Sequence, residues 1–97
     1  MREYHFYIYI LTNKINTCFY IGVTNNLINR LNQHKNKKNA NSFTARYNIN
    51  KLVYYEEYQY IQDAIQREKE LKGWKQYKKI ELIKSKNSSF IDVGKDF

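Results

Sequence analysis

The chain has little of what would place it in a membrane or outside the cell. Its 97 residues include no proline, three glycines and a single cysteine, Cys18. One cysteine excludes an intrachain disulfide and a cysteine-rich zinc site, and it suits a reducing cytoplasm. No apolar run approaches the roughly 20 residues of a membrane span, and the polar start at Met1–Tyr4 leads directly into a strand pattern. We therefore expect a cytoplasmic protein without a signal peptide or a membrane segment.

Acidic residues are also scarce. Nine Asp and Glu face 17 Lys and Arg, so the formal net charge is +8. A small, strongly basic chain indicates a polyanionic partner, most often nucleic acid, although a merely soluble basic surface is the alternative. The ten tyrosines could pack, stack on bases or bind phosphate, and their number does not separate these uses. Without a repeat or an internal linker, residues 1–97 are expected to form one domain.

Three segments have the aromatic and β-branched composition of strands: His5–Leu11, Cys18–Val23 and Lys51–Glu57. The turn residues of Asn13–Thr17 predict an antiparallel hairpin between the first two. Side chains alternate between the two faces of a strand. The first strand therefore has two apolar faces, which consist of Phe6, Ile8 and Ile10 on one side and Tyr7, Tyr9 and Leu11 on the other.

Three further segments have the spacing of amphipathic helices. The first begins after Thr24, Asn25 or Asn26, any of which can cap it, and ends at about Lys35. The others are Ile61–Lys72 and Trp74–Ser85. Their expected apolar faces are Leu27, Ile28 and Leu31; Ile61, Ala64, Ile65 and Leu71; and Trp74, Tyr77, Ile80 and Ile83. The order β-β-α-β-α-α predicts a small α+β (α/β) fold in which helices cover the faces of a three-stranded sheet.

Glu68 occupies a position on the second of these apolar patterns, at i+7 from Ile61 and i+3 from Ile65. A carboxylate on a buried face is costly unless it is paired, hydrogen-bonded or bound to a metal. An ion pair with Arg67, Lys69 or Lys72 is the structural alternative to a metal site, and the sequence leaves both open.

Arg30 and His34 lie four residues apart and should project from one face of their helix. The planar guanidinium of Arg suits phosphate, and His can bind phosphate or move a proton near neutral pH. Two solvated helix residues are the alternative. Tyr9 and Tyr20 lie in neighbouring strands, where a hydroxyl could orient water, or take a proton if nearby cations lowered its pKa. Aromatic packing within the sheet is the alternative for this pair.

Gly22, at the expected end of the second strand, indicates either close approach of a ligand or backbone, or simply a strand end or bulge. The polar loop that follows the first helix carries Lys35, Lys37 and Lys38, which could bind phosphates without reading sequence.

Taken together, Tyr7-Ile8-Tyr9, Tyr20-Ile21-Gly22, Arg30 and His34 resemble the motifs of the GIY-YIG nuclease superfamily. The resemblance is closest to small single-domain bacterial members of the excision-nuclease-subunit-like type, and it covers residues 5–93. The segment Arg67–Trp74 resembles their metal-ligand helix. Asn87–Asp92 resembles their Asn-Pro-x-Trp-x-Asp/Glu ending but lacks the proline and has Phe90 in place of the tryptophan, and Tyr7 replaces the glycine that opens the family name.

This resemblance implies that the sheet is antiparallel throughout and that Glu68 holds one Mg²⁺ or Mn²⁺. It also implies that Tyr9 and Tyr20 lie near the attacking water, that Arg30 clamps the phosphate, and that His34 contacts phosphate or helps with proton transfer. The identity of the general base stays open. We further expect nucleic-acid contacts from Gly22, Thr24 and Asn87, in addition to the lysines of the basic loop.

The sequence thus predicts a metal-dependent endonuclease that hydrolyses phosphodiester bonds in DNA, with a role in DNA repair or recombination. A non-catalytic basic nucleic-acid-binding module is the alternative. A purely structural protein would leave Glu68, Arg30 and the net charge unexplained. Duplex, branched, single-stranded or damaged DNA, and RNA, all stay open as substrates. Because one active site cuts one strand, a protein partner or a homodimer could direct or complete cleavage.

Overall fold

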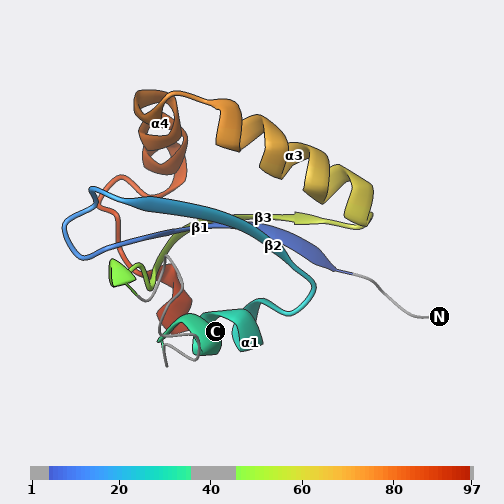
Figure 1. Cartoon of the computed structure of the whole chain (residues 1–97), viewed down its shortest axis with the longest axis horizontal. Coiled ribbons are helices and arrows are strands. Elements are labelled where there is room, and N and C mark those ends of the chain that lie inside the picture. The colour runs from blue at the N-terminus through green and yellow to red at the C-terminus, as the bar shows by residue number, and fades with distance from the viewer. Residues whose placement is uncertain (1–4, 36–45, 97) are drawn as a thin grey trace.

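The computed structural model describes residues 5–35 and 46–96 of the chain. Their elements confirm the predicted order and bounds to within two residues (Figure 1). They are β1 (Phe6–Thr12), β2 (Phe19–Thr24), α1 (Leu27–Lys35), β3 (Lys51–Tyr58), α3 (Ile61–Gly73), α4 (Gln76–Lys86) and a 3₁₀-helix, η1 (Val93–Asp96). The strand pattern and the helical spacing were therefore sufficient to locate each of the longer elements.

The three strands form the expected antiparallel sheet, and their order in it is β2-β1-β3. The strand between the other two, β1, is the one whose sequence is apolar on both faces, because it must be covered from both sides. The hairpin that joins it to β2 is closed by the side chain of Asn13. Its Oδ1 accepts hydrogen bonds from the backbone N–H groups of Thr17 and Cys18 at 2.8 and 3.2 Å.

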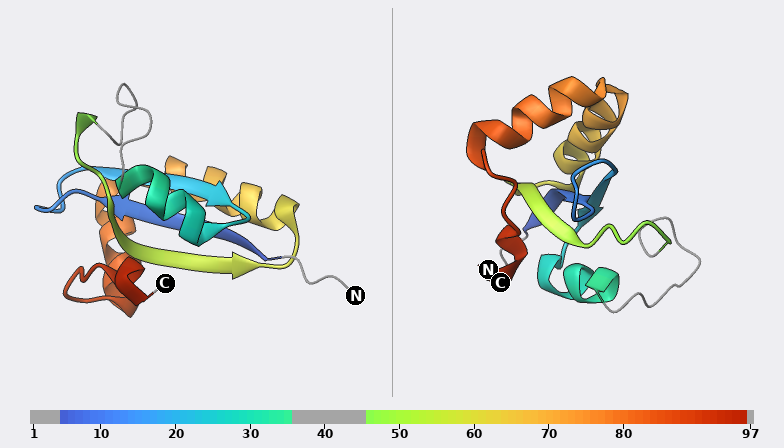
Figure 2. Two further views of the ribbon diagram at one scale, coloured as in Figure 1. Left: turned by 90° about the horizontal axis from the view of Figure 1, so that it is seen from below. Right: turned by 90° about the vertical axis from the view of Figure 1, so that its left-hand side faces the viewer.

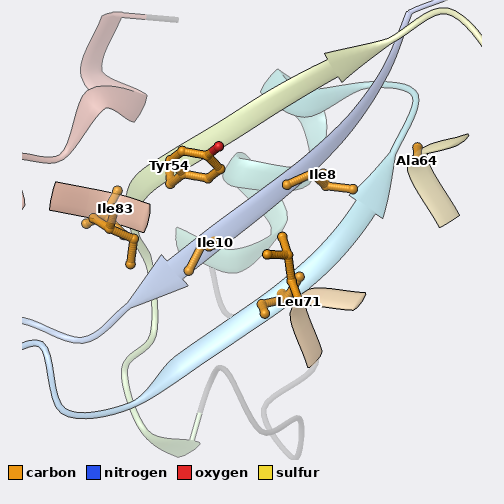
Figure 3. Close-up of a cluster of buried hydrophobic side chains, with 8 residues drawn as sticks. Ile8, Ile10, Tyr54, Ala64, Leu71 and Ile83 are labelled. Atoms are coloured by element: carbon orange, nitrogen blue, oxygen red, sulfur yellow. The ribbon is translucent and has the colours of Figure 1, made fainter. Parts of the chain in front are cut away.

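Helices cover both faces of the sheet (Figure 2). On one face, α3 and α4 enclose a core in which Ile8 and Ile10 meet Ala64, Leu71 and Ile83 (Figure 3). On the other face lie α1 and the C-terminal 3₁₀-helix. The buried residues of this second core are Tyr9, Leu11, Leu27, Leu31, Ile49 and Leu52. Each such Leu or Ile contributes about 1.5–3 kcal/mol relative to an exposed position.

The helices are buried along narrower stripes than their sequences suggest. In α1, Leu27 and Leu31 are buried, but Ile28 is 53% exposed. Ile65 of α3 and Tyr77 of α4, also expected in the core, are 40% and 56% exposed. Those three expectations were wrong because a sheet of only three strands covers one narrow stripe of each helix, and neighbouring apolar positions lie beyond its edge.

The last helix also begins later than expected. Trp74 and Lys75 are extended, with ψ of 149° and 152°, so α4 starts at Gln76. The Trp74 ring lies beneath the guanidinium of Arg67, whose Cζ is 5.3 Å from the ring centroid. This cation–π contact holds the link between α3 and α4 in place.

Candidate active site

The side chain of Tyr9 crosses from β1 over its neighbour in β2. Tyr9 is paired in register with Gly22 and is only 1% exposed. A Cβ atom built on Gly22 would lie 2.5 Å from the Tyr9 hydroxyl oxygen and 2.6 Å from its Cζ. Gly22 is therefore neither a strand end nor a bulge, because β2 continues to Thr24. A close approach does occur at Gly22, but the group that approaches is the Tyr9 ring and not a ligand or another backbone.

Three rings meet at this point. The ring centroids of Tyr9 and Tyr20 are 6.2 Å apart, those of Tyr9 and His34 6.1 Å, and those of Tyr20 and His34 5.5 Å. The Tyr9 hydroxyl lies 3.4 Å from Nε2 of His34. Two strand tyrosines and a helix histidine thus converge.

The start of α1 determines how His34 is directed toward the sheet. Asn26 is the cap, because its Oδ1 accepts the backbone N–H of Asn29 at 3.0 Å. Leu27 and Leu31 anchor the helix to the sheet, and Arg30 and His34 lie one turn apart beside that buried stripe. Arg30 is exposed, and its charge acts on the pKa values of both Tyr9 and His34. The arginine and the histidine are therefore close to the same tyrosine.

Glu68 is carried by α3, which packs on the sheet face opposite to α1. The negative charge of its carboxylate raises the pKa of Tyr9, but it is the weakest of the effects that act on that hydroxyl. Its side chain is 22% exposed, and its Oε1 lies 3.3 Å from Nζ of Lys72. Of the ion pairs considered from the sequence, the structure has the one with Lys72. That pair does not exclude a metal site, because a carboxylate has two oxygens and about four acceptor positions.

Burial determines the protonation of the cluster. It raises the pKa of Tyr9 well above its ordinary value; Tyr20 and Glu68 raise it further, and the opposing effect of Arg30 is smaller. Tyr9 is therefore a protonated hydrogen-bond donor at neutral pH, and nearby cations do not make it a base. Burial, with the positive charge of Arg30, lowers the pKa of His34 below 6.5. His34 is thus neutral at pH 7 and can accept a proton.

Other residues predicted to bind nucleic acid have internal partners. Thr24 is 6% exposed, and its Oγ1 accepts the backbone N–H of Asn26 at 3.1 Å. The Asn87 amide donates to the backbone oxygens of Val53 and Ile91 at 3.1 and 2.8 Å, and it accepts the N–H of Ile91 at 3.0 Å. Asn87 therefore ties the C-terminal segment to β3, and nucleic-acid contact by these two side chains stays a prediction.

The basic loop is outside what the structure describes. Lys35 is the last residue of α1, but its side chain is not among those described, and Lys37 and Lys38 fall in the undescribed range 36–45. Their phosphate contacts also stay a prediction.

A partly buried ionic network was not predicted from the sequence. Nε and Nη2 of Arg67 donate to the two carboxylate oxygens of Glu56 at 3.0 and 3.1 Å. The hydroxyls of Tyr54 and Tyr58 donate to the same carboxylate. Although burial alone would raise the pKa of Glu56, these hydrogen bonds hold it below its ordinary value. The network ties α3 to β3 one residue before Glu68.

A sequence signal for this network exists. Tyr54, Glu56 and Tyr58 alternate along β3 and so share one face, on which Tyr54 is buried. A carboxylate on that face requires a donor, and Arg67 is the cation that supplies it. From its position next to Glu68, Arg67 was a candidate partner for that residue and not for Glu56.

Two negative findings concern the described residues alone. Within residues 5–35 and 46–96, no group of three or more His, Cys, Asp and Glu side chains could hold a metal ion. No helix in the same part of the chain is long and apolar enough to cross a membrane.

Comparisons with known proteins show the family and agree with the fold. The family model described as the GIY-YIG catalytic domain matches residues 5–81. A UPF0213 protein of Pediococcus pentosaceus is 33% identical over 88 residues, which cover 91% of this chain and 90% of that protein. The solution NMR structure of a UPF0213 protein from Bacillus halodurans has a TM-score of 0.57 at 26% identity, covering 91% of this chain and 92% of the other.

Proposed function

The chain belongs to the GIY-YIG family, and from this premise we propose that it is a divalent-metal-dependent endonuclease that hydrolyses phosphodiester bonds in DNA. The observation that supports the proposal most is the contact among Tyr9, Tyr20 and His34. Arg30 lies one helical turn from His34, and the charges of Arg30 and Glu68 both act on the pKa of Tyr9. These five side chains come from β1, β2, α1 and α3. Packing alone requires neither the exposed arginine nor the carboxylate, and a shared nucleic-acid ligand would account for both.

Arg30 is the phosphate-binding group in this proposal. Its guanidinium is exposed, always charged, and shaped to donate two parallel hydrogen bonds to a phosphate. Close to the buried hydroxyl of Tyr9, it would stabilise the extra negative charge of the pentacovalent phosphorus. The net charge of +8 would draw the nucleic acid to this surface.

In this proposal His34 accepts a proton and Tyr9 donates a hydrogen bond. His34 is neutral at pH 7 and is therefore the better acceptor, whereas Tyr9 retains its proton and is a donor. Because the Tyr9 hydroxyl lies only 3.4 Å from Nε2 of His34, the attacking water would lie beside this pair and not between the two groups. Tyr9 would orient it, and it would lose its proton to His34 as its oxygen attacks the phosphorus. The new P–O bond forms as the bond to the leaving oxygen of the sugar breaks. Tyr20, whose ring lies next to those of Tyr9 and His34, would limit the positions that the water can take.

Glu68 is the residue that would hold Mg²⁺ or Mn²⁺. The donor set fits such an ion, because Mg²⁺ is commonly bound by one or two carboxylates together with substrate phosphates and several waters. A cage of three or more protein ligands is therefore not needed. When bound, the ion supplies Lewis-acid polarisation of the phosphate and neutralises the leaving oxygen.

The test is cleavage of labelled supercoiled, single-stranded and branched DNA with Mg²⁺ or Mn²⁺. Glu68→Gln and Arg30→Ala should lower the rate by at least about 100-fold, and EDTA should stop it. Glu81→Gln, at an exposed carboxylate of α4, is the matched control and should leave the rate unchanged. Undiminished cleavage by both site variants would rule out this assignment.

Salt-sensitive binding without cleavage of any substrate would favour the non-catalytic nucleic-acid-binding module instead. A role in DNA repair or recombination, a cytoplasmic location, and a protein partner or homodimer stay predictions. Gel filtration of the protein with and without DNA would test the homodimer.

A further inference from the structure

The Glu68 carboxylate already has a cationic partner, Lys72, and the two residues differ in exposure. The Lys72 side chain is 55% exposed, whereas that of Glu68 is 22% exposed. They are spaced i, i+4 with the acid nearer the helix N-terminus, which is the favourable order for such a pair. Lys72 is thus the more exposed member of the pair and lies one helical turn along α3 from Glu68.

The Lys72 ammonium and a divalent cation would compete for Glu68. Both are cations that seek the same carboxylate oxygens, and an ammonium 3.3 Å from Oε1 repels a metal bound there. An exposed i, i+4 pair is weak, so a metal can displace the lysine at little cost. The displaced side chain remains tethered one turn away on a flexible four-carbon stem.

In a complex with nucleic acid, the displaced Lys72 ammonium could then bind a phosphate of the nucleic-acid backbone. Lysine binds phosphate as a point charge and adapts its position through its stem. We propose that Lys72 is a substrate-contacting residue that exchanges the Glu68 carboxylate for a backbone phosphate next to the scissile bond when Glu68 takes up a metal. The inference rests on the proposed function, because it requires a metal at Glu68 and nucleic acid at the site.

The exchange predicts that substitution of Lys72 strengthens Mn²⁺ binding and weakens nucleic-acid binding. Lys72→Met should bind Mn²⁺ about twofold more tightly, which is the strength of an exposed pair of this kind, and Lys72→Glu should bind it more tightly still. Both variants should bind nucleic acid more weakly. Losing one phosphate contact lowers the slope of log affinity against log salt by about one.

The matched control is Lys69, an exposed lysine in the same helix that takes no part in the ion pairs between described residues. Lys69→Met and Lys69→Glu change the net charge by the same amounts. They should leave Mn²⁺ affinity within error of the wild type, and their effect on nucleic-acid binding should be the same with and without metal.

The experiment measures Mn²⁺ affinity by EPR of the free ion, and binding of a labelled oligonucleotide by anisotropy. Anisotropy is recorded over a salt series in EDTA and again in Ca²⁺, with a gel to show that the oligonucleotide is intact. In Ca²⁺ the wild-type Lys72 has been displaced from Glu68 and can bind phosphate. We therefore expect Lys72→Met to lower both the oligonucleotide affinity and its salt dependence mainly in Ca²⁺, and much less in EDTA. Circular dichroism checks that each variant is folded.

Two results would separate the inference from the proposed function. If the wild type binds Mn²⁺ in a Glu68-dependent manner but Lys72→Met matches Lys69→Met in both assays, the exchange is wrong and the nuclease proposal stands. If the wild type shows no Glu68-dependent Mn²⁺ binding, the metal site itself is wrong, and the exchange fails with it.

Discussion

Arg67 binds Glu56 through two guanidinium nitrogens, at 3.0 and 3.1 Å, and thereby fixes the rotation of α3 one residue before Glu68. The side chains are 23% and 15% exposed, so the pair is largely shielded from water. Both charges have several hydrogen-bond partners, which is the condition under which a shielded ion pair is tolerated. The contact links a structural network to the carboxylate of the candidate active site.

Removing one side of this pair should be costly. Arg67→Met leaves the Glu56 carboxylate without its cation, and we expect the free energy of unfolding to fall by about 2–3 kcal/mol. Urea denaturation measures this loss, and the exposed Lys69→Met serves as the control. In a double-mutant cycle with Glu56→Gln, the second change should cost much less than it does alone. Equal, additive losses would show that the two residues do not act together.

The same network predicts a pH dependence of stability. Because the pKa of Glu56 is lowered in the folded protein, its contribution is fully present above the ordinary carboxyl value of 4.5. It is lost as the pH falls through the lowered, folded-state pKa, since the unfolded chain then binds the extra proton. Glu56→Gln should therefore flatten the decline of stability below pH 4.5. An unchanged acid limb in urea titrations would contradict this assignment.

Gly22→Ala should disturb the cluster directly. The added methyl would lie 2.5 Å from the Tyr9 hydroxyl oxygen, so the ring must move or the strands must separate. We expect a loss of stability of about 1–3 kcal/mol, as for overpacked cores, together with a strong loss of cleavage. Gly73→Ala is the control, because a Cβ there meets nothing within 4 Å, and it should be neutral or stabilising. Similar behaviour of the two variants would show that Tyr9 does not require the glycine.

Arg30 should control the ionisation of His34. Burial lowers the pKa of His34, and the charge of Arg30 lowers it further, so Arg30→Ala should raise that pKa toward its ordinary value of 6.5. NMR titration of the His34 ring measures the shift, with the exposed His5 as an internal reference. Arg30→Lys retains the charge and should keep most of the lowering. If His34 is the base, cleavage should increase with pH through a value below 6.5.

Asn87 should act through the C-terminal segment. Its amide makes three hydrogen bonds to the backbone of Val53 and Ile91. Asn87→Ala should lower the free energy of unfolding by about 1–2 kcal/mol and speed amide exchange after α4. Nucleic-acid affinity of the folded variant separates two roles: an unchanged value makes Asn87 purely structural, and a clear loss supports the contact expected from the sequence.

Much of this architecture could be predicted from the sequence because it depends on local periodicity. A two-residue alternation located the strands, and the i, i+3, i+4 spacing located the helices. The short hairpin brought Tyr9 near Tyr20, and one helical turn brought Arg30 near His34. Both relationships span few residues and follow from the geometry of a hairpin or a helix. These two residue pairs of the candidate site could therefore be predicted without the tertiary structure.

Relationships between elements were decided by the tertiary structure. From the sequence, the partner of Glu68 could have been Arg67, Lys69 or Lys72. In the fold, α3 packs on the sheet so that Arg67 pairs with Glu56, and Glu68 pairs with Lys72. Strand register, which composition does not reveal, placed the Tyr9 ring over Gly22.

The sequence by itself thus determined which strands and helices form and which candidate site residues each of them carries. The tertiary structure decided how those residues are charged. The pKa of Tyr9 is raised because burial outweighs the adjacent Arg30, and that balance depends on how much water the packed sheet and helices exclude. Solvent exclusion is a property of the assembled fold, so no local pattern could have supplied the sign of the shift.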